Sequence, residues 1–124
     1  MQRILLIDEN ELILEGLKLH LSPRFVVITA SDPYSALMEM GETKIDLILI
    51  DLIMPATSGF SLIASLRQQH PGTPIIAMSG WGKPVPPNAL NVAKVLLKPF
   101  DLEELDRSLD EVLCPQSSAP IYIA

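Results

Sequence analysis

The sequence is poor in cysteine, in basic residues and in long apolar runs. Its 124 residues include one cysteine, Cys114, so no disulfide can form within the chain and no cysteine cluster can bind zinc. Against 15 Asp and Glu there are 9 Lys and Arg, a net charge of −6, which argues against direct binding of nucleic acid. No apolar run approaches the roughly 20 residues of a membrane span, and a signal-peptide pattern is lacking. We expect a cytoplasmic chain that does not enter the membrane.

The chain does contain enough apolar residues to build one buried core, with 48% hydrophobic and 19% charged residues. Short apolar runs of strand length recur along it. They are continuous rather than alternating, which is typical of strands covered on both faces of a parallel sheet. The predicted strands are 4–7, 25–28, 47–50, 75–78 and, more weakly, 95–97.

Segments with helical spacing of apolar residues lie between these runs. Asp32 before Pro33, and Asp101 before Leu102, are typical N-caps. The regular alternation of strand and helix predicts an α/β, doubly wound parallel sheet. The apolar stripes expected to face the core are Ile13, Leu17 and Leu21; Leu37 and Met40; Phe60, Ile63 and Leu66; and Leu102, Leu105, Leu109 and Val112.

Two segments depart from this alternation. Between residues 80 and 91, prolines at 84, 86 and 87 remove backbone donors, so any fourth helix is expected to be short or irregular. Residues 114–124 contain Pro, Ser and Gln and are typical of a tail or the start of a linker. We therefore expect one domain over residues 1–113, followed by that tail.

The informative polar residues fall at the ends of the predicted strands. Asp8 and Glu9 follow the first strand, Asp51 ends the third, Ser79 the fourth and Lys98 the fifth. In a doubly wound sheet, ligands bind beyond the carboxyl ends of the strands, so these residues are expected to meet at one edge. Clustered carboxylates favour a hard divalent cation such as Mg²⁺. One carboxylate would then be free to attack a phosphoryl group, with the lysine and the hydroxyl contacting its oxygens.

Four stretches carry a resemblance to a known family. They are residues 4–9 (ILLIDE), 51–55 (DLIMP) with Gly59 downstream, 74–80 (PIIAMSG) and 97–100 (LKPF). In this order they resemble the receiver domain of two-component response regulators, over about residues 2–113. The resemblance implies a five-stranded parallel sheet with the flavodoxin-like strand order 2-1-3-4-5.

The same resemblance implies a role for each matching residue. Asp51 would be the phosphoacceptor. Asp8, Glu9 and the backbone carbonyl of Ile53 would join it in binding Mg²⁺ or Mn²⁺. Ser79 and Lys98 would contact the phosphoryl oxygens, and the peptide bond between Lys98 and Pro99 would be cis.

The chain also departs from the family pattern. The second acid is commonly Asp and is here Glu9, and a Tyr or Phe that often acts as a rotating switch is replaced by Val95. Ile53 and Trp81 lie two residues after Asp51 and Ser79, respectively. Both are bulky and apolar, so we expect them to flank the phosphoryl group, hinder water and prolong the phosphorylated state.

These features predict a signalling module rather than an enzyme. It would accept a phosphoryl group from a sensor histidine kinase or a histidine phosphotransfer protein, then bind a downstream target or control an output domain outside this chain. The alternative is a pseudo-receiver that binds partners without phosphorylation. A phosphohydrolase is disfavoured because Ile53 stands where such enzymes place a second acid. Asp8 and Glu9 also suit plain caps of the first helix.

Overall fold

The computed structural model describes residues 1–54, 57–80 and 91–113, with only the backbone described at 53–54 and 57–58. Its elements are β1 (Arg3–Ile7), α1 (Glu11–Leu21), β2 (Val26–Ala30), α2 (Pro33–Glu42), β3 (Leu47–Asp51), β4 (Ile53–Met54), β5 (Thr57–Ser58), α3 (Gly59–Gln69), β6 (Ile75–Ser79), β7 (Lys94–Leu97) and α5 (Leu102–Leu113). Five strands pair in parallel in the order β2-β1-β3-β6-β7. This is the predicted order 2-1-3-4-5, and the prediction is confirmed.

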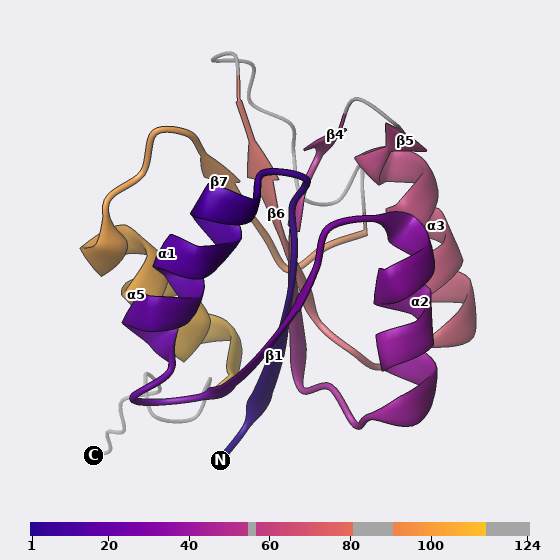
Figure 1. The fold of residues 1–124 in the computed structure, drawn as a ribbon, viewed down its shortest axis with the longest axis horizontal. Coiled ribbons are helices and arrows are strands. Elements are labelled where there is room, and N and C mark those ends of the chain that lie inside the picture. Colours follow the sequence, from indigo (N-terminus) through magenta and orange to yellow (C-terminus); the bar gives the residue numbers. More distant parts are fainter. Residues whose placement is uncertain (55–56, 81–90, 114–124) are drawn as a thin grey trace, which may run out of the picture.

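The sheet forms the middle of three layers (Figure 1). Helices α1 and α5 cover one face, and α2 and α3 cover the other. Because successive side chains of a strand point to opposite faces, each apolar run fills both layers of core. In β1, Ile4 and Leu6 pack toward α1 and α5, whereas Leu5 and Ile7 pack toward α2 and α3. The continuous apolar runs of the sequence are thus explained by burial on both sides.

Side-chain caps define where the helices begin. Asp32 accepts a hydrogen bond from the Ser35 backbone N–H at 2.8 Å, and Asp101 accepts one from the Glu104 backbone N–H at 2.7 Å. Both predicted caps are present. Helix α1 is capped by Asn10, whose Oδ1 accepts from the backbone N–H of Leu12 at 3.0 Å. The interpretation of Asp8 and Glu9 as plain caps of this helix is therefore wrong.

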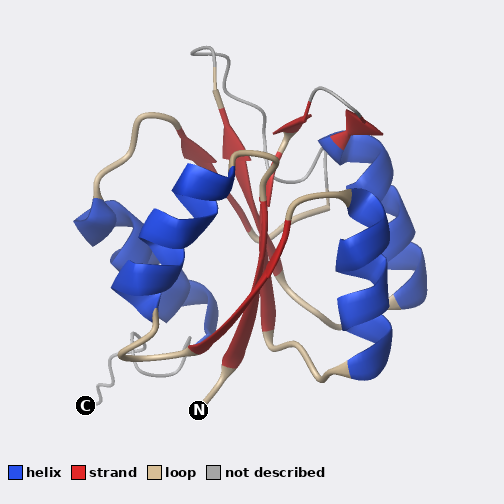
Figure 2. Cartoon of the chain, viewed as in Figure 1, coloured by secondary structure: helices blue, strands red, loops and turns tan. Residues whose placement is uncertain are grey.

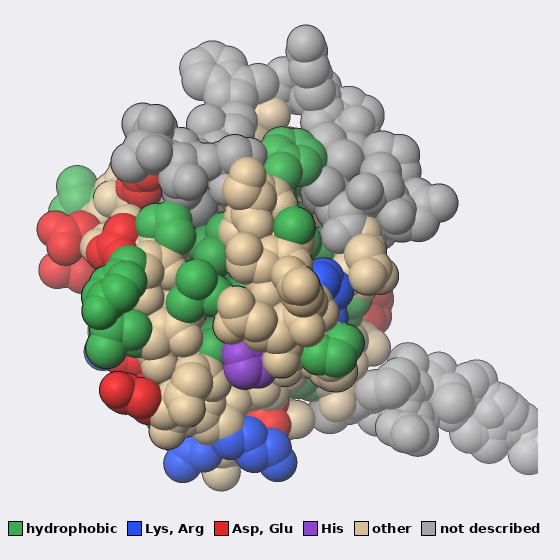
Figure 3. All heavy atoms as spheres, turned by 90° about the vertical axis from the view of Figure 1, so that its right-hand side faces the viewer, with side chains coloured by type: hydrophobic (Ala, Val, Ile, Leu, Met, Phe, Trp, Pro, Cys, Tyr) green, Lys and Arg blue, Asp and Glu red, His purple; other side chains and the backbone are tan. Residues whose placement is uncertain are grey.

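Two positions in the predicted apolar stripes do not reach the core. Phe60 lies in the first turn of α3 and is exposed, while Leu62, Ile63 and Leu66 are buried. Leu102, the first residue of α5, is likewise exposed. Both residues lie in the first turn of a helix, so no preceding turn continues the apolar stripe beside them. Figure 3 shows hydrophobic side chains reaching the surface on the face formed by α2 and α3.

A short antiparallel ribbon joins β3 to α3. Ile53 pairs with Ser58 and Met54 with Thr57. Figure 2 shows this ribbon at the edge of the molecule toward which the carboxyl end of β3 points. Strands of two residues carry no recognisable periodicity, and the sequence did not predict them.

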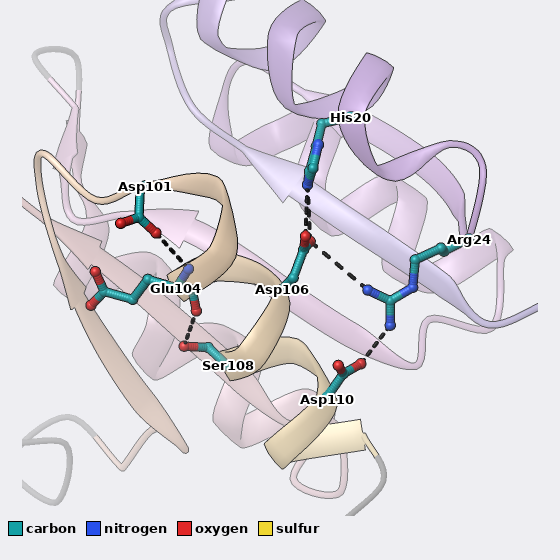
Figure 4. A network of polar contacts seen from close by, with 7 residues as sticks. All are labelled: His20, Arg24, Asp101, Glu104, Asp106, Ser108 and Asp110. Atoms are coloured by element: carbon teal, nitrogen blue, oxygen red, sulfur yellow. Dashed lines mark hydrogen bonds and ion pairs between the residues drawn. The ribbon is translucent and has the colours of Figure 1, made fainter.

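Polar contacts join α1 and α5 at the surface (Figure 4). His20 Nε2 lies 2.9 Å from Asp106 Oδ1, and Arg24 pairs with both Asp106 and Asp110. Within α5, the buried Ser108 hydroxyl donates to the Glu104 carbonyl at 2.8 Å. The contacts of His20 and Arg24 hold the C-terminal end of α1 and the turn after it against α5.

Some predictions fall on residues that the structure does not describe. The irregular fourth helix and Trp81 lie within 81–90, and the predicted tail is 114–124. Among the described helices, none is long and apolar enough to cross a membrane.

Candidate functional site

Three of the predicted site residues meet at the carboxyl edge of the sheet. Asp51 ends β3, Asp8 follows the adjacent strand β1, and Lys98 follows β7. The Lys98 ammonium lies 3.1 Å from Asp51 Oδ2 and 3.5 Å from Asp8 Oδ2. Asp8 is 2% exposed and Asp51 7%. Two buried carboxylates and one ammonium therefore share a crevice with a net charge of −1.

Asp8 is positioned through its neighbour Asn10. The Asn10 backbone N–H donates to Asp8 Oδ1 at 2.8 Å, while the Asn10 side chain caps α1. Asp8 Oδ2 is buried and accepts no hydrogen bond from the part of the chain that the structure describes, although Lys98 is within ion-pair distance. A buried carboxylate oxygen without a donor is costly unless a cation compensates it.

The electrostatic environment of Asp8 disfavours its charged form. Burial raises the pKa of the Asp8 carboxyl, and the negative charge of Asp51 raises it as well. The Asn10 N–H and the Lys98 ammonium lower this pKa, yet they do not cancel the increase. The site is therefore short of positive charge, as expected for a cation-binding pocket.

Backbone hydrogen bonds extend the sheet by one residue at each of these strand ends. The Asp8 N–H donates to the Ala30 carbonyl at 3.2 Å. The N–H of Leu52, directly after Asp51, donates to the Met78 carbonyl at 2.9 Å, and the Lys98 N–H donates to Ser79 at 2.7 Å. The backbone at each charged residue is thus held by the neighbouring strand.

The remaining predicted residues surround this cluster. Ser79 is buried at the end of β6, and its hydroxyl lies 3.4 Å from the Gly80 carbonyl. Glu9 is half-buried directly after Asp8. Val95 is half-buried in β7 and packs against the core on the α2 and α3 side. The Lys98–Pro99 peptide bond is cis.

Two of the predicted flanking groups have no described side chain. Ile53 is the first residue of β4, where the structure describes the backbone, and Trp81 lies outside the described residues. Their shielding role is therefore not tested by the structure.

The donor set suits a magnesium ion. Within residues 1–54, 57–80 and 91–113, no three His, Cys, Asp or Glu side chains form a group able to hold a metal. The carboxylates that do converge are those of Asp8 and Asp51, which both lie beside Lys98. Mg²⁺ commonly binds through one or two carboxylates and keeps several waters, so this pair fits it, and the buried Asp8 Oδ2 accepts no hydrogen bond from the described residues.

A sequence profile of the response regulator receiver domain matches residues 4–110 of the chain. The chain belongs to this family. Receiver domains of this family are signalling modules of two-component systems, and the predicted family and function class are confirmed at that level.

Known relatives of this receiver domain are longer proteins. The transcriptional activator protein PfeR of Pseudomonas aeruginosa is 32% identical over 115 residues, which cover 90% of this chain and 37% of the activator. The chain spans about a third to a half of the length of the curated relatives it matches.

Solved receiver structures match the fold over nearly its whole length. The signal receiver domain of an HD domain-containing protein from Pseudomonas fluorescens Pf-5 superposes with a TM-score of 0.82 at 31% identity, covering 95% of this chain and 98% of that one. The response regulator TrrA from Thermotoga maritima, solved in complex with Mg²⁺-BeF, gives a TM-score of 0.81 at 25% identity, covering 91% and 100%.

An apolar hollow of about 380 Å³ lies beside the cluster of Asp8, Asp51 and Lys98. Lys98 lies in its wall together with Ile13 and Leu17 from α1 and with Pro99 and Phe100 after β7. The sequence did not predict this hollow, because its walls come from segments more than 80 residues apart. The role of Asn10 was also missed, although Asn is among the residues preferred at N-caps.

Proposed function

We propose that this receiver domain accepts a phosphoryl group on Asp51 in a reaction that requires Mg²⁺, or Mn²⁺ in its place. The observation that carries the proposal is the ion pair of Asp51 with Lys98 beside the buried Oδ2 of Asp8, which accepts no hydrogen bond from the described residues. Ligands for the metal would be Asp8 and Asp51, which converge at Lys98, together with the backbone carbonyl of Ile53 and Glu9, whose side chain would have to move toward them. When bound, the ion would neutralise the charge of the carboxylates and of the incoming phosphoryl group.

The protein's own groups would carry the transfer. An Asp51 carboxylate oxygen forms a bond to phosphorus while the bond from phosphorus to the leaving group breaks, and the leaving group departs with the electron pair. Lys98, which pairs with the Asp51 carboxylate before transfer, would pair with the phosphoryl oxygens after it, and Ser79 would donate a hydrogen bond to the phosphoryl oxygens. The site modifies itself and turns over no external substrate, apart from the later hydrolysis of its own acyl phosphate.

The phosphodonor would be a sensor histidine kinase or a histidine phosphotransfer protein in the cytoplasm. The apolar hollow beside Lys98 supports a protein donor, since it offers a side chain of the partner a place to bury next to the acceptor. The downstream step would be binding of a protein target or control of an output domain outside this chain. Direct binding of nucleic acid by this domain is disfavoured by its net charge of −6.

The test is phosphoryl uptake from acetyl phosphate, followed by intact-protein mass spectrometry. Wild type should gain one phosphoryl group with Mg²⁺ and none with EDTA, and Asp51→Asn should gain none under either condition. Asp8→Asn should weaken the response to Mg²⁺ more than Glu9→Gln, because Asp8 is the more buried acid. Wild type that stays unmodified at saturating Mg²⁺ would favour the alternative, a pseudo-receiver that binds partners without phosphorylation.

A further inference from the structure

Gly59, the first residue of α3, lies against the backbone of the acceptor residue. A Cβ atom built on Gly59 would be 2.7 Å from the Leu52 Cα, 2.8 Å from the Asp51 carbonyl oxygen and 2.8 Å from the Leu52 carbonyl oxygen. Ordinary contacts of a Cβ atom begin near 3.4 Å. All three neighbours are main-chain atoms, so no side-chain rotation can make room. Only glycine fits this position without movement of the backbone.

Glycine is required at position 59 because there is no space for a side chain, and not because the backbone conformation is unusual. The φ angle of Gly59 lies outside the left-handed region that favours glycine. The Gly59 N–H also donates to the Leu52 carbonyl at 3.3 Å, which closes the base of the β4–β5 ribbon. The close approach is therefore part of how α3 joins the acceptor strand.

Neither side of this contact moves easily. The Asp51–Leu52 backbone is held by the sheet, since Asp51 is paired with Met78 and the Leu52 N–H is bonded to the same residue. Helix α3 is held by the buried side chains of Leu62, Ile63 and Leu66. A shift forced between these two anchors falls on the backbone that follows Leu52, beginning with Ile53.

The size of the shift decides its effect on the site. A Cβ at 2.7 Å must move by 0.3 Å to reach 3.0 Å, below which real Cβ contacts are essentially never seen, and by 0.7 Å to reach an ordinary contact at 3.4 Å. Functional constellations tolerate displacements of only about 0.5 Å. The backbone that must move begins with Ile53, whose carbonyl is a proposed metal ligand, two residues after the acceptor Asp51.

We propose that Gly59 is a positioning residue for phosphoryl acceptance: its missing side chain lets α3 set the backbone of Asp51, Leu52 and Ile53 in the geometry that binds the metal. The inference rests on the proposed function. It predicts that Gly59→Ala weakens Mg²⁺ binding by roughly 10- to 100-fold, the range found when residues that orient metal ligands are changed. The rate of phosphoryl uptake at a fixed, subsaturating Mg²⁺ concentration should fall in parallel.

Two matched variants separate positioning from general loss of stability. Gly41→Ala places the same methyl group in α2, where nothing lies within 4 Å of the added atom. Leu109→Ala removes a fully buried side chain from α5, which covers the other face of the sheet from α3, and destabilises the protein without touching the α3 contact. Both should keep the wild-type affinity for Mg²⁺ and the wild-type rate of phosphoryl uptake, measured at a temperature where circular dichroism shows each protein folded.

The measurements are Mg²⁺ titration by calorimetry and phosphoryl uptake from acetyl phosphate by mass spectrometry. Weakened Mg²⁺ binding in Gly59→Ala alone supports the proposal. A Gly59→Ala protein that resembles Leu109→Ala, less stable but with unchanged Mg²⁺ affinity, overturns it. If the single variant does not fold, it is measured in a Gly16→Ala/Gly41→Ala background with trimethylamine N-oxide. Failure to fold there also overturns the proposal, because the glycine would then serve the fold and not the site.

The outcomes for wild type distinguish the two proposals. Wild type that binds no Mg²⁺ and takes up no phosphoryl group refutes the proposed function, and this inference with it. Normal wild type with an unaltered Gly59→Ala protein refutes the positioning role alone.

Discussion

Replacing Lys98 by methionine keeps the length of the side chain but removes the positive charge beside Asp8 and Asp51. The two carboxylates are almost fully buried, and the ammonium lies 3.1 Å from one and 3.5 Å from the other. At an effective dielectric constant of about 20, unit charges at such distances attract by roughly 5 kcal/mol, before the cost of desolvation is subtracted. In the absence of metal, the variant retains two buried negative charges that repel one another.

The net loss of stability is smaller than this attraction. Removing one partner of a fully buried pair typically costs about 3–5 kcal/mol. The Lys98 side chain keeps 27% of its surface exposed, so solvent screens part of its charge. We therefore expect Lys98→Met to lower the free energy of unfolding by about 2–3 kcal/mol in EDTA at neutral pH.

The assay is urea unfolding followed by circular dichroism, with Lys94→Met as the matched control. Lys94 is the first residue of β7, at the opposite end of that strand from Lys98. It pairs with Glu111 at 3.0 Å, and the two side chains are 32% and 49% exposed. An exposed pair contributes less than about 1 kcal/mol. Equal losses in the two variants would refute the view that Lys98 compensates buried charge. Added Mg²⁺ should narrow the gap between Lys98→Met and wild type, since a bound cation compensates the same carboxylates.

Three further predictions concern other positions. Because the folded-state pKa of Asp8 is raised, the free energy of unfolding of wild type falls as pH rises from the ordinary aspartate pKa through the raised value. In EDTA, Asp8→Asn should therefore become more stable relative to wild type as pH rises above the ordinary aspartate pKa, measured by urea unfolding. Ile53→Asn and Trp81→Ala should each shorten the lifetime of the phosphorylated protein, followed by mass spectrometry after the phosphodonor is removed; unchanged lifetimes in both would refute shielding. Asp101→Ala should lower the free energy of unfolding by about 1 kcal/mol, because the Glu104 N–H loses its cap. Asp101→Asn should retain most of the wild-type stability, because an Asn side chain can also cap the helix.

The strands could be predicted because the information is local and repeated, whereas their order was implied by the resemblance to receiver domains. Each buried strand is a continuous apolar run, and the acids and the lysine stand at the ends of these runs. Since parallel strands end at the same edge, strand assignment alone brings Asp8, Asp51 and Lys98 together. Phe60 and Leu102 were predicted to face the core but are exposed. Both lie in the first turn of a helix, where the apolar stripe has a neighbouring turn on only one side.

The finer geometry of the site could not be predicted in this way. The close approach of Gly59 to Leu52 depends on how α3 packs against the sheet, and no spacing in the sequence reports that distance. The same is true of Asp8, whose two oxygens have different surroundings: Oδ1 faces the Asn10 N–H, while Oδ2 faces Lys98. These features depend on tertiary structure over tenths of an ångström, whereas the sequence pattern fixes only which residues share an edge.

The backbone bonds that continue the sheet past its strand ends have a consequence for how the site responds. The amides of Asp8, Leu52 and Lys98 are each bonded to the next strand, so they belong to the same cooperative unit as the buried core. Hydrogen exchange at these three amides should require opening of the sheet itself and not a local fluctuation. The backbone at Asp51 is therefore rigid, and a displacement caused by a change at Asp51 is expected in neighbouring backbone that this ladder does not hold, such as Ile53–Met54 of β4.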